Sequence, residues 1–265
     1  MKQPIILFRD ELSVEGELDC ARQYFNTVEQ RSSVPPNSLV IGRYSCLPYY
    51  KELETDLAAN GSQLINTWRQ HQWIASFEYY EVVKNFTFET WFNAVDLPYD
   101  GTQFVVKGVT NSRKHDWNNM MFASDKHRAI EIMWKLQQDS LIGQQQIIFR
   151  RYEPLITYEI GINGLPFTNE WRIFCYKQNI VVYGYYWSIA DNTEHTLPQE
   201  ALDFAQEIIN VVHPHVNFYV LDIAQKVDGS WALVEINDGQ MSGTSTCDLH
   251  KLYSNLQKLI NTENY

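Results

Sequence analysis

Two apolar runs near the end of the chain, residues 218–224 and 231–237, flank the dipeptide Asp228-Gly229. Asp-Gly is typical of the two-residue type I′ turn, whose twist matches that of the strands it joins. The two runs are therefore predicted to form a β-hairpin with Asp228 and Gly229 as its central turn residues. A turn of known length fixes which residues of the two strands face each other, so this feature constrains the fold more than any other in the sequence.

Pairing counted back from this turn sets Asp222 directly opposite Glu235. Asn237 lies two residues beyond Glu235 and so shares its face. Directly opposed like charges destabilise a sheet, and the apolar neighbours predict partial burial, where unpaired charges are unfavourable. A divalent cation such as Mg²⁺, which accepts carboxylate and amide oxygens, would neutralise the two acids. The alternative is that Asp222 is a strand-end acid paired with an arginine.

The chain has 265 residues, of which 45% are hydrophobic, enough for a substantial core in one composite unit or two domains. Its formal net charge of -11 opposes non-specific attraction to nucleic acid or anionic lipid, so neither is expected as a partner. No apolar run approaches the roughly 20 residues of a membrane span, and the apolar residues 5–8 are too few for a signal peptide and predict a first strand. Four scattered cysteines without a CxxC pair suggest neither a zinc site nor a disulfide framework, which fits a cytoplasmic protein.

The loop at 97–101, which carries proline and glycine, is the predicted domain boundary. Before it, residues 39–42 are predicted to form a buried strand and residues 49–60 a helix that ends at Gly61, which is an α/β pattern. Residues 79–92 are predicted to be helical in part.

After the boundary, long strands and helices alternate in a pattern typical of an α+β domain. A helix is predicted to begin at Ser124, whose hydroxyl can cap it, and another at Pro198, whose apolar residues form one stripe. Strands are predicted at 103–109, 146–151, 170–176 and 180–187, and the chain closes with the hairpin and a final helix.

The order of these parts resembles the ATP-grasp superfamily. The resemblance is carried by five short segments between about residue 103 and residue 240: Val105-Val106-Lys107, residues 147–152, Glu170-Trp171-Arg172, Leu221-Asp222 and Glu235-Ile236-Asn237. More loosely it covers the first hundred residues, whose strands and segment 61–66 resemble the Rossmann-like α/β domain that precedes the grasp. The resemblance implies domains at 1–100 and 101–265, the second with two subdomains hinged near 150–153.

The resemblance also implies ATP and Mg²⁺ as ligands, with Asp222, Glu235 and Asn237 holding the metal. Lys107 then contacts ATP phosphates, as a compact positive charge facing an anion; the alternative is an exposed strand lysine. The hinge supplies further contacts to the nucleotide, with backbone groups facing adenine and an acid facing ribose: Arg150, Arg151, Tyr152 and Glu153. Glu153 is equally compatible with a solvated acid at a strand end.

Arg172 matches an arginine that stabilises an acyl phosphate in related ligases, and Glu170 lies on the same strand face. The alternative is an ion pair between Glu170 and Arg172. The loop that holds Arg113 and Lys114 follows the Lys107 strand as the phosphate-covering loop does, but it lacks that loop's usual glycines, so a charged surface loop is the alternative.

Lys107, Arg150 and Arg172 together resemble a clade of small ATP-grasp proteins associated with bacteriophages and bacterial conflict systems. That resemblance implies an ADP-forming carboxylate-amine ligase acting on a small-molecule or peptide carboxylate and an amine acceptor. Two alternatives share the fold, a phosphotransferase acting on a hydroxyl and a nucleotide-binding module without catalysis.

Overall fold

The computed structural model describes residues 3–10, 13–44, 46 and 48–262. The chain begins with a parallel sheet, whose strands lie in the order β2-β1-β3-β4. Its elements are β1 (Gln3–Phe8), α1 (Glu17–Arg22), β2 (Asn26–Val28), the 3-10 turn η2 (Arg31–Ser33), β3 (Ser38–Arg43), α2 (Tyr50–Ala59) and β4 (Gln63–Leu64). This confirms the predicted strands and helix, and Gly61 has the positive φ of 79° expected just beyond a helix end.

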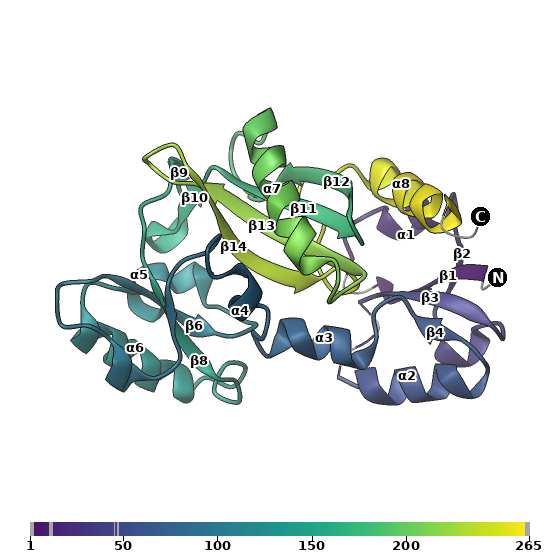
Figure 1. Ribbon diagram of the computed structural model, residues 1–265, viewed down its shortest axis with the longest axis horizontal. Coiled ribbons are helices and arrows are strands. Elements are labelled where there is room, and N and C mark those ends of the chain that lie inside the picture. The colour runs from purple at the N-terminus through teal and green to yellow at the C-terminus, as the bar shows by residue number, and fades with distance from the viewer. Residues whose placement is uncertain (1–2, 11–12, 45, 47, 263–265) are drawn as a thin grey trace.

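Two helices follow the first sheet, α3 (Trp68–Ala75) and the single-turn α4 (Tyr80–Val83). The α3 helix lies between the N-terminal sheet and the part of the molecule that holds α4 and the second sheet (Figure 1). Its N-terminus is closed by a capping box, in which the Thr67 side chain accepts from the Gln70 backbone and the Gln70 side chain accepts in return. The segment 79–92, predicted to be helical in part, contains α4 and ends in a short strand, β5 (Thr90–Trp91).

The second sheet is antiparallel, with the strand order β5-β8-β6-β7. Its elements are β5 (Thr90–Trp91), η3 (Ala94–Asp96), β6 (Phe104–Gly108), η4 (Lys114–Asp116), α5 (Trp117–Met120), β7 (Phe122–Ala123), α6 (Lys126–Gln137) and β8 (Ile147–Arg151). The β5 strand precedes the boundary predicted near residue 100, but it pairs with β8 and so belongs to this sheet. The α6 helix is capped by Asp125, whose carboxylate accepts from the Arg128 backbone, so Ser124 is not the cap that the sequence predicted.

The third sheet is also antiparallel, in the order β12-β11-β13-β14, and a small hairpin, β9-β10, lies beside it (Figure 1). The elements are β9 (Thr157–Ile160), η5 (Ile162–Gly164), β10 (Pro166–Thr168), β11 (Glu170–Tyr176), β12 (Asn179–Tyr185), α7 (Gln199–Val212), β13 (Phe218–Gln225), β14 (Trp231–Asp238) and α8 (Leu249–Thr262). The predicted α+β half, with its closing hairpin and helix, is confirmed.

The two faces of the third sheet have different partners. Ile173 and Leu221 belong to the buried cluster that includes the apolar stripe of α7. On the opposite face Phe174 and Val220 pack with α8 and with the N-terminal sheet. Because side chains alternate along a strand, Arg172 and Asp222 share that second face and lie where the parts of the molecule meet.

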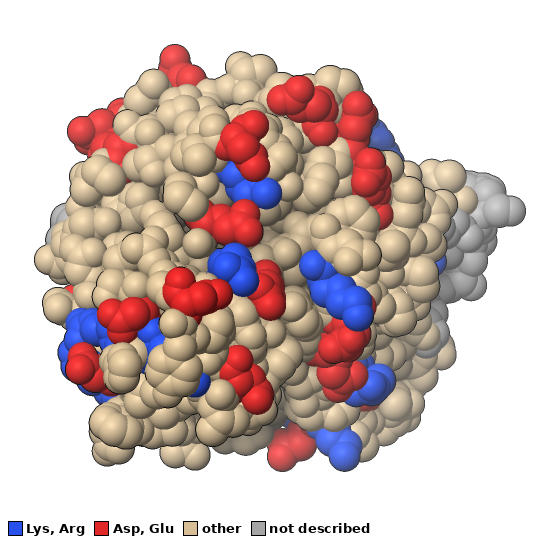
Figure 2. All heavy atoms as spheres, turned by 60° about the vertical axis from the view of Figure 1, so that its left-hand side comes forward, with Lys and Arg blue, Asp and Glu red and all other residues tan. Residues whose placement is uncertain are grey.

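None of the described helices is long and apolar enough to cross a membrane. On the face shown in Figure 2, acidic and basic side chains are interspersed, and some of them surround a central hollow.

Candidate active site

The β13-β14 hairpin pairs Asp222 with Glu235, as the sequence predicted, but it does so through a different turn. The backbone of Lys226 donates to Ser230 at 2.8 Å, so the loop has three residues, and Gly229 ends it with a φ of 89°. The prediction of a two-residue turn was therefore wrong by one residue. A β-bulge between the turn and Asp222 shifts the register back and restores the pairing.

The bulge is held by neighbouring segments. The backbone of Leu233 donates to Phe86 at 2.8 Å, and the hydroxyl of Thr87 donates to the Leu233 carbonyl at 2.6 Å. Arg150 donates to the Val234 carbonyl and, at 2.6 Å, to the Thr87 hydroxyl. Arg150, which the sequence assigned to the nucleotide, thus holds β14 from the second sheet, although it also lines the pocket described below.

Asp222, Glu235 and Asn237 converge as predicted, and Asn237 donates to Asp222 at 3.3 Å and to Glu235 at 3.1 Å. Arg172 donates from two nitrogens to the two oxygens of Asp222, at 2.9 and 2.7 Å. Lys107 donates to the remaining oxygen of Glu235 at 2.6 Å. All four carboxylate oxygens therefore have partners, and two cations balance two anions.

Arginine and lysine thus supply the neutralisation that the sequence argument attributed to a metal. The arginine partner of Asp222 that the alternative predicted is thus present, although Asp222 lies within β13 and not at a strand end. Burial raises the pKa of Glu235, but Lys107 and Lys114 outweigh burial and hold that pKa well below its usual range. The Glu235 carboxyl is consequently charged at neutral pH.

A pocket of about 830 Å³, including the part open to solvent, lies against this cluster. It is formed by the second sheet on one side and by β10, β11 and β14 on the other. Of the predicted site residues, eight line it: Lys107, Lys114, Arg150, Arg151, Tyr152, Glu153, Glu170 and Glu235.

Glu170 presents a free acceptor to this pocket. The side chain is buried, with 4% exposed, and Thr168 donates to one carboxyl oxygen at 3.1 Å while the other oxygen has no partner. Burial raises the pKa of Glu170 to about 7, against the opposing effect of Lys114. Since Arg172 is held by Asp222, Glu170 remains available to a ligand that donates a hydrogen bond.

The loop after β6 contributes Ser112 and Lys114 to the lining of the pocket. Lys114 donates to the Tyr186 hydroxyl at 2.6 Å, with its ammonium 4.4 Å from the Tyr186 ring centre, and Asn163 donates to the His115 carbonyl at 2.7 Å. These contacts connect the loop to the third sheet and to the β9-β10 hairpin. The structure thus places Lys114 at the pocket, whereas the role of this loop as a phosphate lid stays a prediction.

Arg113 points elsewhere. Both of its contacts, at 2.6 Å, are to the carboxylate of Asp139, and it is not among the residues that line the pocket. Among the loop residues that the sequence assigned to the nucleotide, Lys114 thus lies at the pocket and Arg113 does not.

The residues predicted to form the hinge contact partners elsewhere in the chain. Arg151 forms an ion pair with Glu89 at 2.6 Å, and Glu153 forms one with Lys226 at 3.3 Å. The Tyr152 backbone donates to Gln103 at 2.8 Å. Glu153 is therefore already paired, so Glu170, with its free oxygen, is the better acceptor for a ligand hydroxyl.

The donor set fits magnesium. Mg²⁺ is usually held by one or two carboxylates together with substrate phosphates and water, and only rarely by a cage of protein ligands. Asp222 and Glu235 would supply two carboxylates to such an ion, and Asn237, whose amide nitrogen now faces both acids, would supply its oxygen after a turn of the side chain. Among the described residues there is no group of three or more acidic, histidine or cysteine side chains that could bind a metal alone.

The sequence did not reveal Thr87, Thr168 or Tyr186, although each contacts a site residue. Strand alternation limits the face on which Tyr186 lies, but its position beside Lys114 depends on the pairing of β11 with β12, which no local signal in the sequence encodes.

The antiparallel sheets that enclose the pocket, with a lysine on one and an acid-x-amide motif on the other, define an ATP-grasp fold. The chain belongs to the ATP-grasp family of the R2K clade: residues 98–256 match the family described as "ATP-grasp domain, R2K clade family 3". This match confirms the fold and the family that the sequence motifs predicted.

Solved structures with the same fold match over nearly the whole chain. D-cycloserine synthetase DcsG has a TM-score of 0.64 at 11% identity and covers 97% of this chain and 99% of its own. The ATP-grasp ligase PsnB, complexed with a minimal precursor, Mg and ADP, has a TM-score of 0.58 at 10% identity, covering 99% and 98%. D-alanyl-alanine synthetase A from Vibrio cholerae has 0.57 at 11%, covering 98% of each chain. At these identities the likeness is one of fold. No curated protein sequence matches the chain.

Proposed function

We propose that this protein is an ATP- and magnesium-dependent ligase, which activates a carboxylate as an acyl phosphate for attack by an amine. The observation that carries the proposal is the hydrogen-bonded cluster of Lys107, Arg172, Asp222, Glu235 and Asn237, of which Lys107 and Glu235 line the pocket. Its cations and metal-type oxygens are those that phosphoryl transfer requires. The ligase names of the structural neighbours, among them a D-cycloserine synthetase, are consistent with it.

ATP is proposed to occupy the pocket, with its base near the hinge and its phosphates toward the cluster. Lys107 and Lys114 then bind phosphate oxygens, because compact ammonium groups match an anion and both line the pocket. The free oxygen of Glu170 accepts a hydrogen bond from a ribose hydroxyl. The loop that carries Lys114 excludes water from the phosphates, which favours transfer to substrate over hydrolysis.

Asp222, Glu235 and Asn237 would hold magnesium. When bound, magnesium supplies positive charge that offsets the charge of the phosphate oxygens. As Lys107 turns from Glu235 to a phosphate, one carboxylate oxygen becomes free for the metal. Asn237, which donates to both carboxylates, would hold the metal through its amide oxygen after its side chain turns.

Arg172 is proposed to bind the transferring phosphoryl group. The substrate carboxylate attacks the γ-phosphorus, the bond to the β-γ bridging oxygen breaks, and ADP leaves. An amine then attacks the acyl carbon, phosphate departs and the amine proton is lost, which gives an amide. Fixed positive charge from Arg172 stabilises the oxygens on which negative charge accumulates in the first step.

Product analysis tests this function. The protein is incubated with Mg²⁺, ATP and a panel of amino acids and peptides, with hydroxylamine added as a trapping nucleophile. The expected products are ADP, phosphate and a hydroxamate of one carboxylate in equal amounts. Asp222→Asn, which keeps the side-chain shape, should abolish them.

Three other outcomes would contradict the proposal. AMP and pyrophosphate would indicate an acyl adenylate. A stable phosphoester formed without any amine would indicate a phosphotransferase. Thermal stabilisation by ATP without product from any substrate, including a host-cell extract, would indicate a nucleotide-binding module.

A further inference from the structure

The segment that follows Asn237 is held by the N-terminal part of the chain. Asp238 is the last residue of β14, and strand alternation turns its side chain away from the face that holds Glu235 and Asn237. Only 5% of Asp238 is exposed. Its buried carboxylate thus lies immediately behind the proposed metal ligand, at the point where the sheet ladder ends.

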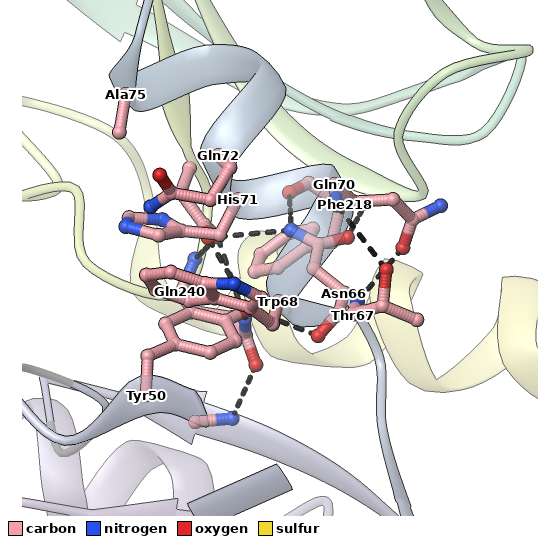
Figure 3. Close-up of polar contacts among 12 residues, drawn as sticks. Tyr50, Asn66, Thr67, Trp68, Gln70, His71, Gln72, Ala75, Phe218 and Gln240 are labelled. Carbon is pink, nitrogen blue, oxygen red and sulfur yellow. Dashed lines mark hydrogen bonds and ion pairs between the residues drawn. The ribbon is translucent and has the colours of Figure 1, made fainter. Parts of the chain in front are cut away.

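The Asp238 carboxylate has donors on both oxygens. Asn66 donates to one oxygen at 2.9 Å, and the Gln240 backbone donates to the same oxygen at 3.0 Å. The Nδ1 atom of His71 lies 3.1 Å from the other oxygen. Figure 3 shows Asn66, His71 and Gln240 gathered around this point, at the junction of α3 with the end of β14.

Asn66 uses both ends of its amide. Its nitrogen donates to the Phe218 carbonyl at 2.6 Å as well as to Asp238, and its oxygen accepts from the backbones of Phe218 and Asn217 at 2.8 and 3.2 Å. Asn66 is fully buried. Since Phe218 begins β13 and Asp238 ends β14, this amide ties together the two strands that carry the proposed metal ligands.

His71 is fixed by aromatic stacking. Its ring lies 4.6 Å from the Tyr50 ring with an angle of 17°, and 5.8 Å from the Trp68 ring, an arrangement visible in Figure 3. The Tyr50 hydroxyl donates to the Asn66 carbonyl at 2.9 Å and accepts from Gln240 at 2.6 Å. His71 therefore has little freedom to move away from Asp238.

We propose that Asn66 and His71 are positioning residues, which act through Asp238 to orient Asn237 toward magnesium. The inference rests on the proposed function, in which Asn237 is a metal ligand. Groups that fix metal ligands from behind typically change metal affinity 10- to 100-fold when they are removed. Both residues precede the region matched by the family, so the N-terminal part of the chain would contribute directly to the metal site.

The test measures metal binding, because a general loss of stability would not change it below the unfolding temperature. Mn²⁺ is titrated into protein saturated with ADP, by calorimetry, for wild type, Asn66→Ala and His71→Ala. We expect the Mn²⁺ dissociation constant to rise roughly 10- to 100-fold in both variants. His71→Asn, whose amide nitrogen can donate in place of Nδ1, should retain most of the wild-type affinity.

Asn217→Ala is the matched control. The Asn217 side chain donates to the Ile65 carbonyl at 2.7 Å at the same junction, but it does not contact Asp238. This variant should lower the unfolding temperature and leave Mn²⁺ affinity within about twofold of wild type, well below the effect expected for removing a group behind a ligand.

Glu235→Gln separates this inference from the proposed function. If Glu235→Gln leaves Mn²⁺ affinity unchanged, the metal assignment itself fails. If Glu235→Gln weakens binding and both His71→Ala and Asn66→Ala bind Mn²⁺ as wild type does, the positioning role alone is overturned. Should Asn66→Ala not fold, the comparison of His71→Ala with His71→Asn decides, and equal affinities would reject the role.

Discussion

Replacing Lys107 by methionine removes the cation that faces Glu235 while keeping a side chain of similar length. The two charged groups are 2.6 Å apart, and only 7% of the lysine side chain and 14% of the glutamate side chain are exposed. Removing one partner of a buried ion pair leaves an uncompensated charge and costs about 3–5 kcal/mol. For a chain of this size, the unfolding temperature should fall by roughly 10 °C at neutral pH and without metal.

The same variant should gain the ability to bind a divalent cation without nucleotide. In wild type all four oxygens of Asp222 and Glu235 have protein partners, so Mn²⁺ alone should raise the unfolding temperature little. In Lys107→Met one oxygen of Glu235 is free, and Mn²⁺ at a hundredfold excess over its dissociation constant should restore about 2.7 kcal/mol.

Thermal unfolding with and without Mn²⁺, in the absence of nucleotide, measures both effects. Lys107→Met combined with Glu235→Leu serves as the control, since removing both charges should recover much of the lost stability and abolish the response to Mn²⁺. An equal Mn²⁺ response in wild type and Lys107→Met would refute the claim that Lys107 occupies the metal-binding oxygen.

Further variants test individual residues of the site. Glu170→Gln should unfold at a higher temperature than wild type at pH 8 and at the same temperature at pH 4. The folded-state pKa of Glu170 is about 7, against an ordinary 4.5, so the free energy of unfolding of wild type falls by about 3 kcal/mol as pH rises between those two values. Thermal melts of both proteins across this pH range measure the difference. Arg172→Lys keeps the charge but cannot contact both oxygens of Asp222; initial rates of ADP formation should fall by about 10²-fold or more, and an unchanged rate would remove Arg172 from the chemical step. Arg113→Ala should leave ADP affinity unchanged in a calorimetric titration, since its partner is Asp139 outside the pocket, and a large loss of affinity would place Arg113 at the nucleotide.

The sequence predicted the carboxylate pair correctly although its account of the turn was wrong. Asp228-Gly229 was expected to form a two-residue turn, but the loop takes a third residue, and the bulge beyond it cancels the shift. The bulge is held by Thr87 and Arg150, which lie far away in the chain. A turn signal is local, whereas the bulge depends on tertiary contacts, so only the first could be recognised from the sequence.

The start of α3 carries a helix-start signal in the sequence, although no helix was predicted there. Thr67 and Gln70 have the spacing of a capping box, which marks a helix start. The network that α3 brings to Asp238 could not be inferred in the same way, because Asn66 and His71 contact residues more than 150 positions later in the chain. Local periodicity predicts elements, but it does not predict which buried polar groups meet.

The most direct test of the account is a crystal structure of the protein with Mg²⁺ and a non-hydrolysable ATP analogue. We expect magnesium about 2.0–2.1 Å from oxygens of Asp222 and Glu235, the Asn237 amide oxygen turned toward it, and the Lys107 ammonium moved from Glu235 to a phosphate. Nucleotide and metal bound elsewhere, with Lys107 still on Glu235 and Arg172 still on Asp222, would contradict the proposed active site.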